Sequence, residues 1–294
     1  MGADGAAGGG TQIVRAPAKL NLYMHVCGRR DDGYHDLDSL VVFAGVHDLI
    51  TVEPGAGLSL EIDGPFADAV PADGTNLVIR AAEVLAELAG VDTGAAIRLT
   101  KNLPVASGIG GGSADAAAAI KALVRHWGIH PATHDLSGMA LELGADVPVC
   151  LFGRGAFMGG VGERLEDAPE LPDAALVLVN PGAALSTPEV FGARRGEFSA
   201  PARFEDDIGT AAELADVLRA RGNDLTEAAV ALAPGIADVL NGLAAAEACL
   251  LARMSGSGAT CFGLFEEVAA AEAAAAGLAE GNPGWWVAAT RLGA

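Results

Sequence analysis

The sequence predicts an α+β protein with two domains. Its 294 residues suffice for one large or two medium domains, each with a hydrophobic core. The segment EDAPELPD at 166–173 is rich in Pro and acidic residues, a composition typical of a domain boundary. Strands and helices are expected on both sides of it. We therefore expect domains at 11–166 and 167–294, preceded by a flexible tail at 1–10.

The first half alternates between strand and helix patterns. Strands are expected at 13–26, 40–46, 48–54, 58–62 and 96–100. The pattern at 75–90 predicts an amphipathic helix, because Asn76 is a good cap, apolar residues recur on one face and Gly90 can end it. Further helices are expected after the glycine-rich segment at 107–115 and at 135–143. The segment 143–165 is expected to form a loop, a strand and a turn.

The second half has the order of an α+β domain. A strand is expected at 175–180, and a pair of strands at 250–254 and 260–265 flanks the turn SGSG. Helices are expected at 211–219, 225–233, 236–247 and 267–278, and a last strand at 286–290.

Charge and composition exclude several classes of protein. Lys and Arg number 18 against 38 Asp and Glu, a net charge of −20, which disfavours nucleic acid or an anionic membrane as a partner. The hydrophobic fraction of 51% disfavours disorder. No apolar run approaches the roughly 18 residues of a membrane span. The four cysteines are far apart and form no zinc or redox motif. We expect a cytoplasmic protein.

The strongest local motif is SGIGGGSAD at 107–115, directly before an alanine-rich helix. Glycines let backbone N–H groups approach an anion, and the helix N-terminus adds free donors and a positive dipole end. A flexible linker or a tight capped turn is the alternative. The segment lacks the Lys of a P-loop and the glycine spacing of a dinucleotide fingerprint.

Three segments together resemble the GHMP kinases. They are APAKLNL at 16–22, PVASGIGGGSADAAA at 104–118 and MSGSGATCFGLF at 254–265. The resemblance implies an N-terminal domain like domain 2 of ribosomal protein S5 and a ferredoxin-like C-terminal domain, with the active site in the cleft between them. It also implies ATP as co-substrate and Mg²⁺. Ile109 and Ala114 depart from the Leu and Ser that are usual in the family.

Three further segments resemble one branch of this family. GRRDDGYHDLDSL at 28–40, LGADVPVCLFGRGAF at 143–157 and STPEVF at 186–191 are similar to kinases that phosphorylate the 2-hydroxyl of CDP-methylerythritol. That reaction belongs to the non-mevalonate route to isoprenoid precursors. The expected partners are this small molecule and ATP, with no nucleic acid and no membrane, and the protein is expected to be a monomer or a weak homodimer.

The resemblance also assigns the residues of the ATP site and the catalytic pair. It places Lys19 beside Asp146, with Asp146 as the base or as the group that orients the hydroxyl. On residue type alone, a snorkelling lysine and a turn aspartate are the alternatives. The expected ATP-binding residues are Pro104, Val105, Ala106, Ser107, Gly108, Ile109, Gly110, Gly111, Gly112, Ser113 and Ala114, with the Ser113 hydroxyl also as the Mg²⁺ ligand.

The remaining expected residues bind the substrate. Tyr34 and Phe191 would cover the two faces of the cytosine and His35 would bond its edge. The full set is Asn21, Tyr34, His35, Phe191, Ser255, Gly256, Ser257 and Gly258. Each has a plainer alternative: a strand-edge amide, a surface turn, core packing or an ordinary hairpin turn.

Two other functions stay open. Another GHMP kinase, acting on homoserine or a mevalonate derivative, would not require the GYH turn or TPEVF. A catalytically silent GHMP-fold protein that senses ATP or a metabolite would not require both Lys19 and Asp146.

Overall fold

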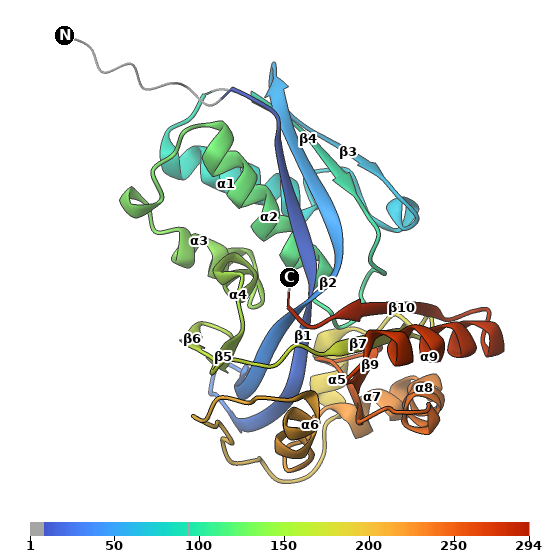
Figure 1. The fold of residues 1–294 in the computed structure, drawn as a ribbon. Helices are drawn as coiled ribbons and strands as arrows, with labels where there is room; N and C mark the ends of the chain where they lie inside the picture. The colour runs from blue at the N-terminus through green and yellow to red at the C-terminus, as the bar shows by residue number, and fades with distance from the viewer. Residues whose placement is uncertain (1–8, 93, 294) are drawn as a thin grey trace. The chain divides into compact units, whose positions relative to one another are not determined.

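The computed structural model describes residues 9–92 and 94–293, which form two compact units (Figure 1). Residues 1–8 of the expected tail lie outside the described residues. The first unit contains the described residues up to Ala16, His47–Val105 and Gly111–Phe152, and the second contains Pro17–Val46, Ala106–Gly110 and the described residues from Gly153 onward. The expected domain boundary near residue 166 stays a prediction. Residues on both sides of it belong to the second unit.

In the first unit, helices pack against hydrogen-bonded strands. β4 (Gly94–Thr100) pairs antiparallel with the end of β2 (His35–Gly55), and β3 (Leu58–Asp63) runs parallel to β4, in the strand order β3-β4-β2. The helices are α1 (Leu77–Ala89), α2 (Gly111–His126), α3 (Leu136–Leu143) and α4 (Val147–Phe152), with short 3₁₀ turns η1 (Ala67–Ala69) and η2 (Pro131–Thr133). α2 packs against both α1 and α4.

Local chemistry explains where α1 begins and ends. The Asn76 side chain accepts a hydrogen bond from the Val78 N–H at 2.8 Å, which satisfies one of the free donors of the first turn. Gly90 ends the helix with a φ of 62°, a left-handed conformation that favours glycine. The predicted helix and both of its caps are confirmed.

The second unit contains a four-stranded antiparallel sheet in the order β10-β7-β9-β8. These strands are β7 (Ala175–Asn180), β8 (Leu251–Met254), β9 (Cys261–Phe265) and β10 (Trp286–Arg291). The helices are α5 (Thr187–Ala193), α6 (Ala211–Arg219), α7 (Thr226–Leu232), α8 (Gly235–Ala245) and α9 (Val268–Gly281). The start of β2 pairs with β5 (Ala156–Gly160), which pairs with β6 (Arg164–Asp167), while β1 (Gln12–Arg29) also pairs with β2.

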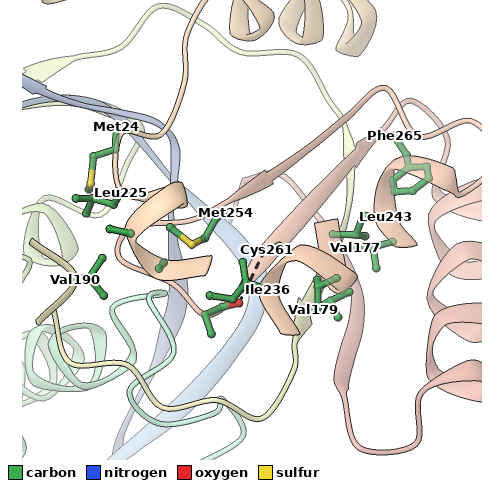
Figure 2. Close-up of a cluster of buried hydrophobic side chains, with 14 of the residues drawn as sticks. Met24, Val177, Val179, Val190, Leu225, Ile236, Leu243, Met254, Cys261 and Phe265 are labelled. Atoms are coloured by element: carbon green, nitrogen blue, oxygen red, sulfur yellow. Dashed lines mark hydrogen bonds between the residues drawn. The ribbon is translucent and has the colours of Figure 1, made fainter. Parts of the chain in front are cut away.

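One face of this sheet builds the core of the second unit (Figure 2). Val177 and Val179 alternate along β7, so both side chains point to the same face. Ile236 and Leu243 of α8 pack against that face, and Met254 and Cys261 lie at the ends of the two strands that flank the SGSG turn. The core therefore fixes the strands from which the second glycine-rich turn projects.

The structure differs from these expectations in a few places. β2 is one continuous strand rather than two strands with a break at residue 47, and it pairs with β5 through Leu37–Val41 and with β4 through Leu49–Gly55. The strand expected within 143–165 is β5, but the segment before it contains a helix at Val147–Phe152 where a loop was expected. A short apolar run is typical of a helix or a strand, and Pro148 is tolerated in a first helical turn. The sequence analysis did not predict α5 and β6.

Candidate active site

Within the second unit, the carbonyl groups of the glycine-rich loop accept hydrogen bonds from other segments. Three consecutive carbonyls accept hydrogen bonds: Ser107 O from Thr260 N at 2.9 Å, Gly108 O from Ser255 Oγ at 3.2 Å and Ile109 O from Lys19 N at 2.9 Å. The loop is therefore not a slack linker, and its backbone orientation is set by contacts from β1 and from the segment that follows β8.

The hydrogen bonds to the carbonyl groups determine the direction in which the backbone N–H groups of the loop point. In a trans peptide the C=O and the following N–H point in opposite directions, so the N–H groups of Gly108, Ile109 and Gly110 face away from the bound carbonyls. None of these three N–H groups has an acceptor within residues 9–92 and 94–293. A row of free backbone donors is the arrangement that binds phosphate oxygens.

The helix that follows adds further donors. α2 begins at Gly111, so the N–H groups of its first turn have no partner within the helix, and the positive end of its dipole lies there. Ser113 is partly exposed on this turn, whereas Ala114 is 2% exposed. The methyl group that replaces the usual family hydroxyl is therefore buried. Before the loop, Pro104 is buried and Val105 is exposed.

Two glycines allow the loop and the SGSG turn to touch backbone to backbone. Gly108 has a φ of 76°, and a Cβ on it would lie 2.4 Å from the Gly258 carbonyl oxygen. Gly256 has a φ of 56°, and its Cβ would lie 2.9 Å from Gly108 O. No side chain fits at either position without displacing main chain.

Ser255 connects the loop to β1 through its hydroxyl group. Its hydroxyl is fully buried, accepts from the Asn21 N–H at 3.1 Å and donates to Gly108 O. The neighbouring Ser257 hydroxyl lies 2.9 Å from that of Thr187. The expected substrate contacts of Ser255–Gly258 stay a prediction.

Lys19 is held inside the second unit by its neighbours on β1 and β2. The side chain is 2% exposed, so it is not a snorkelling lysine, and Nζ donates to Asn21 Oδ1 at 2.8 Å. Asn21 Nδ2 donates in turn to the Ser39 hydroxyl at 2.8 Å. Asn21 is fully buried with both ends of its amide in use, so in this structure it orients Lys19. Its expected contact with substrate stays a prediction.

Asp146 lies at the start of α4 in the first unit. Its carbonyl accepts from the Cys150 N–H at 3.2 Å, which places it as the residue that precedes the helix, and it is partly exposed. The expected pairing of Asp146 with Lys19 stays a prediction.

The expected base-reading residues lie in the second unit. The His35 and Phe191 rings stack with centroids 4.9 Å apart and planes at 23°. Burial, followed by the positive charges of Arg29 and Arg194, lowers the pKa of His35, so the neutral ring can donate at one nitrogen and accept at the other. Tyr34 is 62% exposed, so its ring is available to a ligand. A base cannot fit between His35 and Phe191 as they stand.

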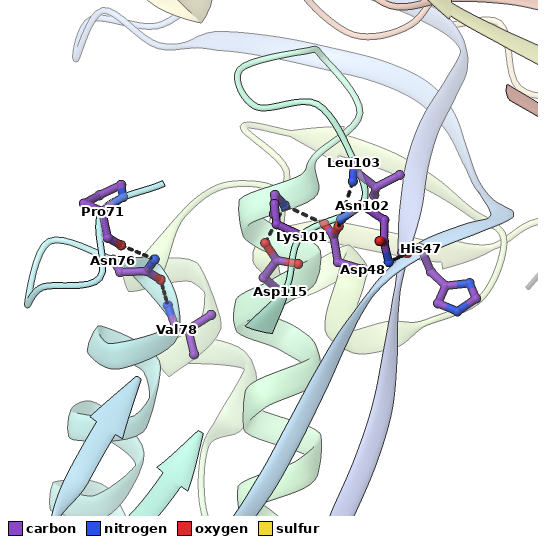
Figure 3. A network of polar contacts seen from close by, with 9 residues as sticks. All are labelled: His47, Asp48, Pro71, Asn76, Val78, Lys101, Asn102, Leu103 and Asp115. Carbon is purple, nitrogen blue, oxygen red and sulfur yellow. Dashed lines mark hydrogen bonds and ion pairs between the residues drawn. The ribbon is translucent and has the colours of Figure 1, made fainter. Parts of the chain in front are cut away.

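A buried ionic cluster that was not expected from the sequence lies at the first turns of α2 (Figure 3). Lys101 Nζ lies 2.5 Å from Asp48 Oδ2 and 2.6 Å from Asp115 Oδ2, and all three side chains are at most 4% exposed. A Cβ on Gly111 would lie 3.1 Å from that Nζ, so the ammonium group supports the first turn of α2. A buried lysine requires such partners, but they lie 53 and 14 residues away.

The two carboxylates of this cluster are not equivalent. Asp48 Oδ1 accepts from the N–H groups of Asn102 at 2.6 Å and Leu103 at 2.8 Å, whereas Asp115 Oδ1 has no partner in the described residues. Burial raises the pKa of Asp115 to about 8, with Lys101 opposing this shift and Asp48 adding to it. Of the two carboxyl groups, Asp115 is therefore the one more readily protonated, because one ammonium group faces two buried carboxyls and only Asp48 has further donors among the described residues.

Asp115→Asn is expected to remove a pH dependence of stability. Native Asp115 keeps a proton that the unfolded chain releases near its ordinary pKa of about 3.9, so stability falls as pH rises from about 4 to 8. Relative to the asparagine variant, the wild type should lose at most about 1.4 kcal/mol per pH unit in this window. Urea unfolding at several pH values measures the difference, and parallel pH profiles for the two proteins would contradict the assignment.

None of the helices in the described part of the chain has the length and apolar character needed to cross a membrane.

Comparisons with known proteins agree with the geometry of the loop and its helix. The family model described as "GHMP kinases N terminal domain" matches residues 76–154, and "GHMP kinases C terminal" matches 201–283. A 4-diphosphocytidyl-2-C-methyl-D-erythritol kinase of Paramagnetospirillum magneticum is 57% identical over 279 residues, covering 95% of this chain and 98% of the relative. The kinase of the same name from Rhodospirillum rubrum is 52% identical over 280 residues, covering 95% and 92%.

Two solved structures are similar to this chain, with different levels of sequence identity. A crystal structure of 4-(cytidine 5'-diphospho)-2C-methyl-D-erythritol kinase is similar with a TM-score of 0.76 and 37% identity, covering 96% of this chain and 100% of that one. Homoserine kinase from Cytophaga hutchinsonii has a TM-score of 0.74 but 19% identity, covering 96% and 95%. The second likeness shows a shared fold alone.

Proposed function

Since this chain belongs to the 4-diphosphocytidyl-2-C-methyl-D-erythritol kinases of the GHMP kinase family, we propose that it transfers the γ-phosphoryl group of ATP to the 2-hydroxyl of CDP-methylerythritol. The reaction serves the non-mevalonate route to isoprenoid precursors. The observation that carries the proposal is identity above 50% to kinases of this name across almost the whole chain. The family and the α+β fold predicted from the motifs are confirmed.

ATP binding is proposed for the loop at 104–114. Phosphoryl transfer depends on positioning and on neutralising phosphate charge, because the protein itself makes few covalent changes. The free N–H groups of Gly108–Gly110 and the N-terminus of α2 supply donors for that purpose. With a net charge of −20, the protein as a whole repels anions, so these directional donors must hold the phosphates.

Lys19 and Asp146 are proposed as the catalytic residues. Asp146 would accept the proton of the substrate hydroxyl or hold that hydroxyl in line with the γ-phosphorus. Lys19 would supply positive charge to the developing negative oxygens. Support comes from its burial and from the hydrogen bond to Asn21, which fix the direction of the ammonium group before a ligand arrives.

Mg²⁺ is proposed to bind with ATP. The described residues contain no group of three or more His, Cys, Asp or Glu side chains that could hold an ion on their own. Kinases usually hold Mg²⁺ through the nucleotide phosphates and one or two protein oxygens, and the partly exposed Ser113 hydroxyl fits that need. The ion would neutralise phosphate charge.

A cytoplasmic location and a monomeric or weakly dimeric state are also proposed.

Recognition of cytosine is proposed for Tyr34, His35 and Phe191. His35→Ala removes the ring that can bond the base edge but leaves the loop and Lys19 intact. An unpaired base edge costs about 1–3 kcal/mol, so CDP-methylerythritol should bind about 5- to 150-fold more weakly. ATP affinity should stay unchanged. Titration calorimetry with each ligand separates the two effects, and an unchanged affinity for the cytidine ligand would count against this assignment.

The proposed reaction is tested with a panel of alcohols. ADP release should be fast with CDP-methylerythritol and close to background with homoserine and mevalonate. Fast turnover of homoserine or mevalonate would favour another GHMP kinase activity. ATP binding without turnover of any alcohol would favour a metabolite sensor.

A further inference from the structure

The turn that holds the phosphate loop is itself held by one asparagine. Asn223 lies between α6 and α7, and its Nδ2 donates to two carbonyls, Met254 O at 2.8 Å and Gly256 O at 2.9 Å. Its Oδ1 accepts from the Leu225 N–H at 2.9 Å. Both N–H groups of the amide are therefore used within the protein, so Asn223 has no donor left for a ligand.

The two bonded carbonyls lie on either side of Ser255. Ser255 is the residue whose hydroxyl donates to Gly108 O in the phosphate loop and accepts from the Asn21 N–H. These bonds fix the peptide directly before Ser255 and the peptide that follows Gly256, and so restrain the Ser255 side chain between them. Asn223 thus acts on the loop through one intermediate residue.

The backbone of Asn223 is anchored to β1. Met24 N donates to Gly222 O at 2.9 Å, and Asp224 N donates to Met24 O at 2.9 Å, so Asn223 lies between two hydrogen bonds to the strand that carries Lys19. Lys19 N in turn donates to Ile109 O. The backbone on either side of Asn223 therefore holds the strand of the proposed catalytic lysine, while its side chain holds the SGSG turn, which in turn holds the loop through Ser255.

We infer that Asn223 is a positioning residue for phosphoryl transfer, which sets the direction of the amide donors in the loop at 106–110. The inference rests on the proposed function. The carbonyls of Ser107 and Gly108 point at the turn, and the N–H groups of Gly108 and Ile109 point the opposite way. A shift of the turn would rotate these peptides and misdirect the donors that receive the ATP phosphates. Misplacement of about 1 Å can cost about 10²-fold in rate.

The test is Asn223→Asp, which keeps the size of the side chain and the acceptor for Leu225 but turns a donor toward two carbonyls into a second acceptor. Calorimetry with Mg²⁺ and a non-hydrolysable ATP analogue should show affinity reduced at least about tenfold. Affinity for CDP-methylerythritol should fall less than affinity for the analogue, because its base is proposed to bind at Tyr34, His35 and Phe191 and not only at this turn. The matched control is Asn282→Asp, since Asn282 Nδ2 donates to the Leu278 carbonyl at 3.0 Å in the same unit. The control should bind both ligands as the wild type does.

Outcomes separate a positioning role from a merely structural one. Equal weakening of both ligands, or unchanged analogue affinity in a folded Asn223→Asp protein, would overturn the inference. If the aspartate variant does not fold, Asn223→Ala removes the same two donors without repulsion and should show the same selective loss. Failure of the proposed function is visible separately: wild-type protein would then bind the ATP analogue but not phosphorylate CDP-methylerythritol.

Discussion

Replacing Asp146 by asparagine is expected to lower turnover by about 10²–10⁴-fold, the usual contribution of a positioned acid or base. Asparagine keeps the shape of the side chain and the place before α4 but cannot accept the proton. ATP affinity should stay unchanged, because the loop donors are not altered. Single-turnover kinetics with saturating ATP and CDP-methylerythritol measure the effect on the chemical step.

Asp135→Asn is the matched control for this variant. Asp135 also precedes a helix of the first unit, where its side chain accepts from the Gly138 N–H at 2.8 Å. The same chemical change at this exposed cap should leave turnover near the wild-type rate. Near-normal turnover in a folded Asp146→Asn protein would remove Asp146 from the catalytic role.

Replacing Gly108 by alanine is expected to abolish measurable ATP binding. The new Cβ would lie 2.4 Å from the Gly258 carbonyl oxygen, a contact with main chain that no rotamer can relieve. The φ of 76° adds about 1 kcal/mol of strain for a residue with a Cβ. The loop must therefore leave the turn, and its donors lose their common direction. Calorimetry with ATP measures the loss.

Gly128→Ala separates backbone strain from the clash. Gly128 has a φ of 66°, close to that of Gly108, but no atom lies within 4 Å of its would-be Cβ. This variant should lose some stability and keep its affinity for ATP. An unchanged ATP affinity in folded Gly108→Ala would mean that the loop is not the phosphate site.

Features that depend on neighbours in sequence could be predicted. α1 followed from the Asn76 cap, the apolar face and Gly90, all within one short segment. The order of helices and strands from α6 to β10 followed in the same way. The change from a glycine-rich loop to a helix at 107–115 followed from glycines placed directly before an alanine-rich segment, a pattern that keeps its meaning without tertiary contacts.

Features that depend on distant contacts could not be predicted. The expected break at residue 47 is absent, because β2 continues into its antiparallel pairing with β4, a strand that lies far along the chain. Lys101 lacks an adjacent acidic partner, and Asp48 reaches it only through the pairing of β2 with β4.

In the candidate site, too, contacts between residues far apart in the sequence could not be predicted. The substrate contact expected of Ser255 stays a prediction, but its supporting contact with the loop could not be predicted, because a glycine-rich turn between strands carries no sign of what it packs against. Its bond to Gly108 O joins positions 147 residues apart. Asn223 lies in a short connection between helices, and the carbonyls that it binds are 31 and 33 residues away. No local pattern distinguishes it from an ordinary turn asparagine.

The most direct test of the central claim is to identify the product formed from ATP and CDP-methylerythritol. Phosphorus NMR of the reaction mixture should show ADP and one new phosphomonoester, with the diphosphate of the substrate intact and the new ester on the 2-oxygen of the methylerythritol unit. Release of inorganic phosphate without a new ester, or ester formation on homoserine or mevalonate instead, would contradict the account.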